Sequence, residues 1–170
     1  MTKTLSLLGR FESIVITVIL SVLLFVPLSS VMAKRPPEIR NQEDLNITAD
    51  MHGQDLSGYE FVKFDLRGIN FSDSNLNGAV FNNSKLKGAD LHGADLQDAL
   101  AYASDFEDTD LSNVNFNNAL LMESNFTNAK IDGADFTDAV ISRIQQKQLC
   151  SVAEGTNSST GVETSYSLGC

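Results

Sequence analysis

Large apolar residues recur at every fifth position over more than half of the chain, from residue 49 to residue 143. The chain divides there into 19 consecutive five-residue units, and the central residue of each unit is large and apolar except at Ala101. The first residue is Ala, Ser, Thr or Val in every unit from Ser74 onward, and the fifth is Gly, Asn or Asp in 15 of the 19. A period of five fits neither the α-helix, with 3.6 residues per turn, nor an uninterrupted strand.

Each position of the unit has a physical role in a short extended segment that ends in a turn. The first and third residues lie two apart, so an extended segment points both toward the same side, one small and one large. Gly, Asn and Asp tolerate the positive φ that a tight turn requires, so the fifth residue can turn the chain. The pattern therefore predicts an all-β solenoid, with the third residues inside and the second and fourth residues outside.

The exceptions to the pattern set the number of sides. Apolar residues occupy the second position at four places that are 20 residues apart, namely Val80, Leu100, Leu120 and Val140. The fifth position departs from Gly, Asn and Asp at places separated by multiples of 20, namely Lys63, Ala103, Glu123 and Arg143. Both deviations repeat every four units, which predicts four sides per coil and one side that is unlike the other three.

The units resemble those of the pentapeptide repeat family, whose unit is usually given as A(D/N)LXX. The stretches ADLHG, ADLQD and ADFTD match it outright, and the resemblance covers residues 49–143. It implies a right-handed quadrilateral β-helix. With four units per coil, the 19 units predict about 4.75 coils, and a spacing of about 4.8 Å between coils predicts a rod about 23 Å long.

Residues 1–33 have the pattern of a signal peptide. Lys3 and Arg10 precede an apolar stretch of about fifteen residues, and the small-residue exit around Ala33 suits cleavage before Lys34. A retained membrane anchor is the alternative, although about 20 residues are needed to span a bilayer. We therefore expect an exported protein with no membrane attachment after cleavage, in which residues 34–48 form a linker and an N-terminal cap.

Residues 144–170 are expected to close the C-terminal end of the solenoid with a helix and a loop. An open end would expose unpaired edges and apolar core, so solenoids need caps. Ile141, Ile144 and Leu149 are the apolar residues of the expected helix, and Gly155 is a suitable residue to end it.

The two cysteines, Cys150 and Cys170, are predicted to form a disulfide, the usual state of a cysteine pair in an exported protein. Two free thiols or a metal-binding pair are the alternatives, but two sulfurs with no histidine nearby do not complete a zinc shell. A tail with a helix, a loop and two cysteines resembles that of the thylakoid lumen pentapeptide repeat proteins of cyanobacteria and chloroplasts. That resemblance implies the thylakoid lumen or the periplasm as the location.

Little in the sequence indicates catalysis or a cofactor. The formal net charge is −10, and removal of residues 1–33 would take away two basic and one acidic residue and leave −11. An acidic surface argues against binding of nucleic acid or anionic membranes. His52 and His92 are expected to lie two coils apart, which is too far to share a zinc ion. We therefore expect no enzyme, no cofactor and no metal site.

The most specific site prediction is an apolar interaction face. Second and fourth residues point outward, so one side of the solenoid is expected to carry Val62, Val80, Leu100, Tyr102, Leu120, Met122 and Val140. A stacked apolar patch of this kind usually marks an interaction surface. The alternative is that the chain itself covers the face, through Leu45 or Ile47 of the linker or Leu168 of the tail.

Two functions follow from these observations. The first is a non-enzymatic, exported structural or protein-interaction module, a lumenal scaffold or accessory protein that binds an as yet unidentified protein. The alternative comes from the resemblance, because some pentapeptide repeat proteins of quinolone resistance are acidic rods that occupy the DNA site of gyrase. The signal peptide argues against this DNA-mimic function, since gyrase is cytoplasmic.

Overall fold

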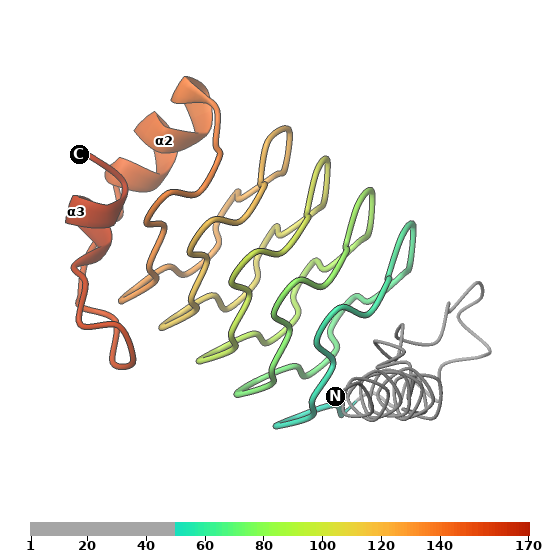
Figure 1. The fold of residues 1–170 in the computed structure, drawn as a ribbon. Coiled ribbons are helices and arrows are strands. Elements are labelled where there is room, and N and C mark those ends of the chain that lie inside the picture. Colours follow the sequence, from blue (N-terminus) through green and yellow to red (C-terminus); the bar gives the residue numbers. More distant parts are fainter. Residues whose placement is uncertain (1–49) are drawn as a thin grey trace, which may run out of the picture. The chain divides into compact units, whose positions relative to one another are not determined.

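The computed structural model describes residues 50–170, so the predicted signal peptide (1–33), the linker (34–48) and Ala49 lie outside the described residues. The chain coils on itself from Asp50 to Val140 and then enters two helices, α2 (Arg143–Cys150) and α3 (Thr164–Ser167) (Figure 1). No helix among residues 50–170 is long and apolar enough to cross a membrane.

Successive coils are joined by parallel backbone bridges between the second residues of equivalent units. Fifteen such bridges run from Asp50 and Asn70 to Leu120 and Val140, and each is a single-residue bridge outside any longer strand. The reason is the length of a side: only the second residue of a unit pairs before the chain turns at the fourth and fifth. The four-unit period that the sequence predicts is thus the register of the hydrogen bonds.

Three hydrogen bonds recur at each side of a coil. In the middle of the rod, Phe81 N donates to Leu100 O at 2.7 Å and Leu100 N donates to Ala79 O at 2.9 Å. Asn83 N, at the corner, donates to Tyr102 O at 2.9 Å. The main chain therefore satisfies its polar groups between coils, as buried backbone must.

Every corner adopts a left-handed conformation, whatever residue occupies it. All eighteen fifth positions from Gly53 to Asp138 have positive φ, seven of them glycines and eleven of them other residues. Ala103 and Glu123 adopt φ of 52° and 65° although neither residue type favours this region. The fold thus imposes the corner, and the glycines only make it easier to form.

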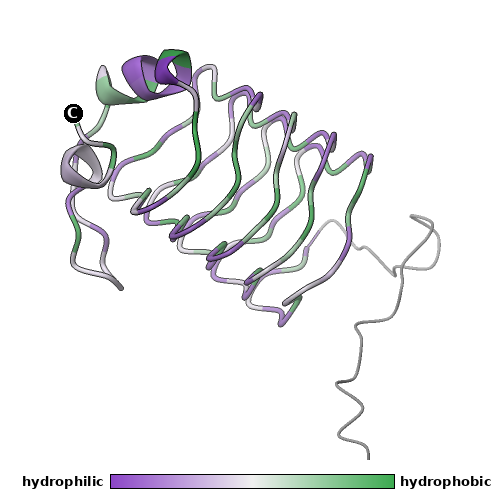
Figure 2. Cartoon of the chain, turned by 45° about the horizontal axis from the view of Figure 1, so that its top comes forward, coloured by the Kyte–Doolittle hydropathy of each residue, from purple (hydrophilic) through white to green (hydrophobic). Residues whose placement is uncertain are grey.

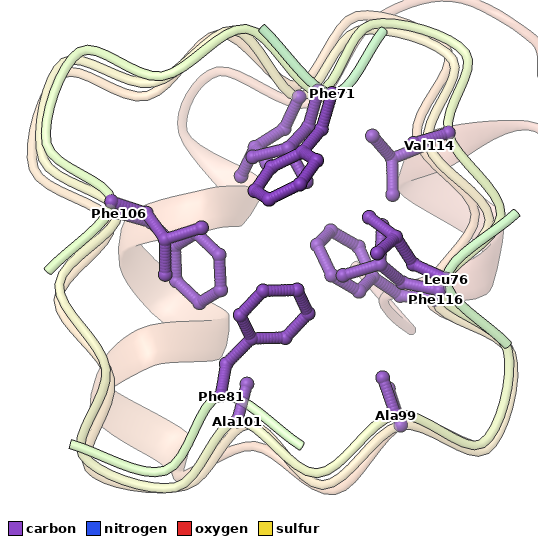
Figure 3. Close-up of a cluster of buried hydrophobic side chains, with 14 of the residues drawn as sticks. Phe71, Leu76, Phe81, Ala99, Ala101, Phe106, Val114 and Phe116 are labelled. Carbon is purple, nitrogen blue, oxygen red and sulfur yellow. The ribbon is translucent and has the colours of Figure 1, made fainter. Parts of the chain in front are cut away.

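The interior is filled by stacked third-position side chains (Figure 3). Phe61 and Phe81 stack with ring centroids 4.9 Å apart, and Phe106 and Phe126 stack at 5.2 Å. The close-up shows the third-position side chains pointing inward from the sides of a roughly square coil. Ala101, the small exception in this series, is fully buried. Each large side chain contributes about 1.5–3 kcal/mol of gross burial free energy.

First-position hydroxyls add a second set of contacts between coils. Ser104 Oγ donates to Phe81 O at 2.8 Å, and Thr109 Oγ1 donates to Leu86 O at 3.1 Å. Both residues are buried. In each pair the acceptor is the central residue of a unit in the coil before. A small polar residue at this position therefore packs closely and also satisfies a core-side carbonyl.

The helix after the repeats differs from its prediction in three ways. It ends at Cys150 and not near Gly155, and its first residue is Arg143, which the pattern assigns to the last repeat unit. Ile144 points to solvent with 75% of its surface exposed, while Gln145 is buried. The cause is local: Ser142 Oγ accepts a hydrogen bond from Gln145 N, and Gln145 Oε1 accepts one from Ser142 N, which starts the helix in place of a corner.

Candidate interaction face and C-terminal cap

The apolar second-position residues lie in one column on one side of the rod. Consecutive bridges join Val80 to Leu100, Leu100 to Leu120 and Leu120 to Val140. The exposed fractions of Leu100, Leu120 and Val140 are 36%, 43% and 41%, while Val80 is half-buried. The structure therefore brings together the second-position residues of the predicted face and leaves most of them open to solvent.

Fourth-position residues widen this column into a face. Val62, Tyr102 and Met122 are exposed, Tyr102 by 50%. Asn82 interrupts the apolar series, and its Oδ1 accepts a hydrogen bond from Tyr102 N at 2.9 Å. We call the seven residues together the apolar face: Val62, Val80, Leu100, Tyr102, Leu120, Met122 and Val140.

Leu168, one of the residues considered as a cover for the apolar face, is engaged elsewhere. It is buried in the same hydrophobic cluster as Phe136 and Leu149, at the C-terminal end of the rod. Leu120 remains exposed with the whole tail in place. The tail therefore does not cover Leu120, while Leu45 and Ile47 lie outside the described residues.

On each of the other three sides, the second-position residues form a polar column that runs from coil to coil. Over most of each column, a carboxylate alternates with an amide or a lysine. Asn75 donates to Asp55, Asn115 to Asp95 and Asn125 to Asp105, through Nδ2 and Oδ1 at 2.9–3.0 Å. Rows of like hydropathy accordingly run from coil to coil (Figure 2). This alternation of carboxylates with amides or lysines separates like charges, which would otherwise lie about 4.8 Å apart in successive coils.

Ion pairs and hydrogen bonds on these polar sides shift the pKa of a few side chains. The side-chain hydrogen bond from Arg67 lowers the pKa of Asp65 below its usual 3.8, and the bond to Glu107 raises the pKa of Lys87. Burial by itself would raise the pKa of Asp110, but hydrogen bonds from Ser112 and Lys130 outweigh burial and lower it. All are surface groups whose pairs contribute little to stability.

The described residues offer no arrangement typical of catalysis or metal binding. Nowhere between residues 50 and 170 do three or more His, Cys, Asp or Glu side chains gather to hold a metal ion. His52 Nδ1 lies 3.0 Å from Ser72 Oγ in an exposed contact. His92 occupies the same column two coils further along, so each histidine is a surface residue near polar neighbours.

Three polar side chains attach the C-terminal segment to the last two coils. Gln145 Nε2 donates to Leu121 O at 2.9 Å and to Ser124 O at 2.8 Å. Asn157 Nδ2 donates to Val114 O, and Ser167 Oγ accepts from Phe136 N at 3.0 Å.

Sequence reasoning missed these attachments. A buried glutamine inside an apparently amphipathic helix cannot be recognised from periodicity, since polar residues are normally assigned to the exposed face. Only the spacing of Ser142 and Gln145, a capping-box pattern, could have located the start of the helix.

A disulfide joins two parts of this C-terminal segment. Cys150, the last residue of α2, is bonded to Cys170, with their Cα atoms 5.6 Å apart. Gln146 Nε2 also donates to Leu168 O at 2.6 Å, so α2 and the segment after α3 are joined by a covalent bond and a hydrogen bond.

Comparison with protein families finds the pentapeptide repeat model in eight copies, over residues 65–100 and 104–143. No curated protein sequence is significantly similar to the chain. Among solved structures, the pentapeptide repeat protein Rfr23 of the cyanobacterium Cyanothece 51142 is 24% identical with a TM-score of 0.54. That alignment covers 55% of this chain and 64% of Rfr23, just under two thirds of it.

Two further structures are similar in sequence but superpose less well. A pentapeptide repeat protein from the Arabidopsis thaliana thylakoid lumen is 39% identical over 70% of this chain and 90% of its own, with a TM-score of 0.29. QnrB1, a plasmid-mediated fluoroquinolone resistance protein, is 26% identical over 55% of this chain and 61% of its own, with a TM-score of 0.32. With its five-residue units in register and its bridges between equivalent units of successive coils, the chain belongs to the pentapeptide repeat family, which forms right-handed quadrilateral β-helices.

Proposed function

We propose that the protein is an exported, non-enzymatic module that binds a protein partner through its apolar face. The observation that carries this proposal is the confinement of six exposed large apolar residues to one side of the coil: Val62, Leu100, Tyr102, Leu120, Met122 and Val140. Contiguous apolar surface rimmed by polar residues is characteristic of interaction sites. The second position of every other side is occupied by Asp, Asn or Lys.

The same proposal holds that the protein is not an enzyme. Pentapeptide repeat proteins are generally structural or interaction modules, and no catalytic family matches the chain. A rod whose interior is filled by side chains offers its outer faces for binding, and a flat apolar face suits a protein surface better than a small molecule.

The cellular compartment of the protein and the extent of its repeats are also part of the proposal. The N-terminal pattern supports export, and a disulfide in the cap fits an oxidising compartment, the thylakoid lumen or the periplasm. We further propose that the repeats form about 4.75 coils including Ala49, and that residues 144–170 act as their C-terminal cap. The description of the Arabidopsis protein names the lumen, while the proposal itself depends on the residues of this chain.

The DNA-mimic alternative has one supporting observation, the acidic charge. Residues 50–170 carry 18 acidic and 7 basic side chains, a net charge of −11. Duplex DNA carries one negative charge per about 1.7 Å, so a rod of about 23 Å would need about 13 to match it. The charges of this chain lie on several sides and include lysines, which is a weaker imitation of a duplex than a continuous acidic row.

Site-specific photocross-linking tests the proposed function. A p-benzoylphenylalanine at Tyr102 should give a discrete cross-linked product with a partner in the native compartment, and the same group at Asn117, on the neighbouring side of that coil, should not. Leu120→Asp should abolish the product while the coil stays folded, because the side chain lies outside the core. The matched control Asn117→Asp adds the same charge and should leave the product unchanged.

Two results would count against a partner on the apolar face. A cross-link from Tyr102 to residues 34–48 of the same chain would show that the chain covers the face itself, in which case Leu120→Asp should make those residues sensitive to protease. Alternatively, equal cross-linking from Tyr102 and Asn117, unaffected by Leu120→Asp, would show that the face is ordinary surface.

A further inference from the structure

The last coil ends in backbone groups that would pair with a next coil, and the C-terminal segment satisfies several of them. Gln145 Nε2 donates to Leu121 O and Ser124 O at the first corner. Gly133 N donates to Glu154 O at 2.8 Å, and Phe136 N donates to Ser167 Oγ. The cap thus replaces a missing coil at separate points around the end of the rod.

One stretch of this end has no such replacement. One coil earlier, Phe106 N donates to Asn125 O at 2.8 Å and Asp108 N donates to Thr127 O at 2.9 Å. The equivalent amides of the last coil belong to Phe126 and Asn128, and within residues 50–170 neither has a hydrogen-bond acceptor. This stretch is an open β-edge with two free donors, two residues apart.

A cleft of about 260 Å³ lies over this edge. On the coil side it is lined by Phe126, Thr127, Asn128 and Ala129, and on the side of α2 and the turn after it by Gln148, Leu149, Ser151 and Val152. None of these side chains is charged. Phe126 is half-buried, although Leu86 and Phe106 in the same interior column are fully buried. The cleft therefore exposes part of a core aromatic.

The size and chemistry of the cleft limit what can occupy it. Pockets for drug-sized ligands measure about 300–1,000 Å³, so this cleft is small for such a molecule and large enough for one aliphatic side chain with part of its backbone. Uncharged walls disfavour a charged ligand, because a buried charge without a partner is costly.

We propose that this edge binds a short, extended and uncharged peptide segment of a partner protein. Two carbonyls of the segment accept hydrogen bonds from Phe126 N and Asn128 N, and an aliphatic side chain between them enters the cleft against Phe126 and Leu149. Alternate carbonyls of an extended strand point the same way, which matches two donors two residues apart. The segment continues the ladder that joins the earlier coils, as in strand addition to an open sheet edge. This surface is the end of the rod and is separate from the apolar face.

The test uses the intact, oxidised protein and the blocked peptide acetyl-Val-Leu-Val-amide as the probe. Without the probe, the amides of Phe126 and Asn128 should exchange with solvent fast by NMR, while those of Phe106 and Asp108 should be protected. Addition of the probe should shift and protect the first pair and leave the second unchanged. Acetyl-Val-Gly-Val-amide should bind at least about tenfold more weakly, because it cannot bury the leucine side chain.

Two substitutions of exposed residues distinguish binding of the probe in the cleft from non-specific binding to the protein surface. Val152→Trp places a large side chain in the cleft and should weaken probe binding at least tenfold, whereas Ile144→Trp, on the exposed face of α2, should leave it within twofold. Protection of Phe126 and Asn128 before the probe is added would mean that this chain or a second copy occupies the edge, and would overturn the proposal. Probe binding that shifts neither amide would also overturn it.

Discussion

A single position of the repeat shows how much the fold, and not the residue, decides local conformation. Ala103 stands at a corner with a φ of 52°, where its neighbours along the column are Asn83 and Glu123 with φ of 59° and 65°. A Cβ in the left-handed region costs about 1–2 kcal/mol, which the surrounding ladders must offset. The sequence marked Ala103 as an exception to the pattern, and the structure shows that its backbone is no exception.

Replacing Ala103 by glycine should stabilise the protein. Glycine removes the Cβ strain but makes the unfolded chain more flexible, so the expected gain is about 0.5–1 kcal/mol in the free energy of unfolding. The matched control is Ala119→Gly, at a buried first position without positive φ, which should lose about 1 kcal/mol. Urea unfolding measures both. A loss of stability in both variants would contradict the strain argument.

At the scale of elements, the cap is the part that sequence reasoning described least well. The coil could be predicted because every position repeats 19 times, so a chance residue does not obscure the pattern. Residues 143–170 occur once, and their attachments depend on single polar side chains such as Gln145, Asn157 and Ser167. No periodicity can reveal which polar residue is buried when the surface that it contacts is formed by a distant part of the chain.

Gln145→Ala should be a severe substitution for a helix residue. Gln145 is 6% exposed and donates to the carbonyls of Leu121 and Ser124, so its loss takes the donor from Ser124 O, leaves Leu121 O with only the bond from Ser124 N, and removes the capping box with Ser142. The expected cost is about 2–4 kcal/mol by chemical denaturation. Gln148→Ala, at an exposed position of the same helix, should change stability by less than about 0.5 kcal/mol. Equal effects would show that Gln145 does not hold the cap.

Reduction of the disulfide should loosen the cap before the coil. The bond between Cys150 and Cys170 closes a loop of 20 residues, which stabilises by about 3 kcal/mol in the chain-entropy model, whereas the ladders of the coil contain no cysteine. Mass measurement of the oxidised protein should show two hydrogens fewer than the reduced chain. After reduction, amide exchange should rise first in residues 143–170. Unfolding of the whole rod in one step on reduction would contradict an independent repeat core.

At the scale of the molecule, the rod is a stack in which each coil pairs with the coils before and after it. Such a solenoid is stabilised by the sum of its units and their interfaces, so its length can vary while its register cannot. The register is what places the apolar face on one side, because Val80, Leu100, Leu120 and Val140 align only if four units make one coil.

Two internal deletions test whether partner binding depends only on which residues of the apolar face are present, or also on their lying on one side of the rod. The whole-coil deletion removes residues 74–93, and with them Val80 of the apolar face, but it keeps Leu100, Tyr102 and Leu120 on the same side as Val62. The half-coil deletion removes residues 84–93 and takes out none of the seven face residues. It turns everything after the junction by two sides, so that Leu100 and Leu120 lie opposite Val62 and Val80.

Both deletion variants should fold, because each junction joins the end of one unit to the start of another and keeps the spacing of the corners. Circular dichroism and thermal unfolding check this, and the variant that is shorter by a whole coil should be the less stable of the two, since it loses more buried core. With the photocross-linker at Tyr102, the whole-coil deletion should retain the partner product and the half-coil deletion should lose most of it. If the half-coil deletion cross-links as well as the whole-coil deletion, then the partner needs only the five face residues after the junction, which stay aligned with one another, and Val62 and Val80 are not part of the binding surface.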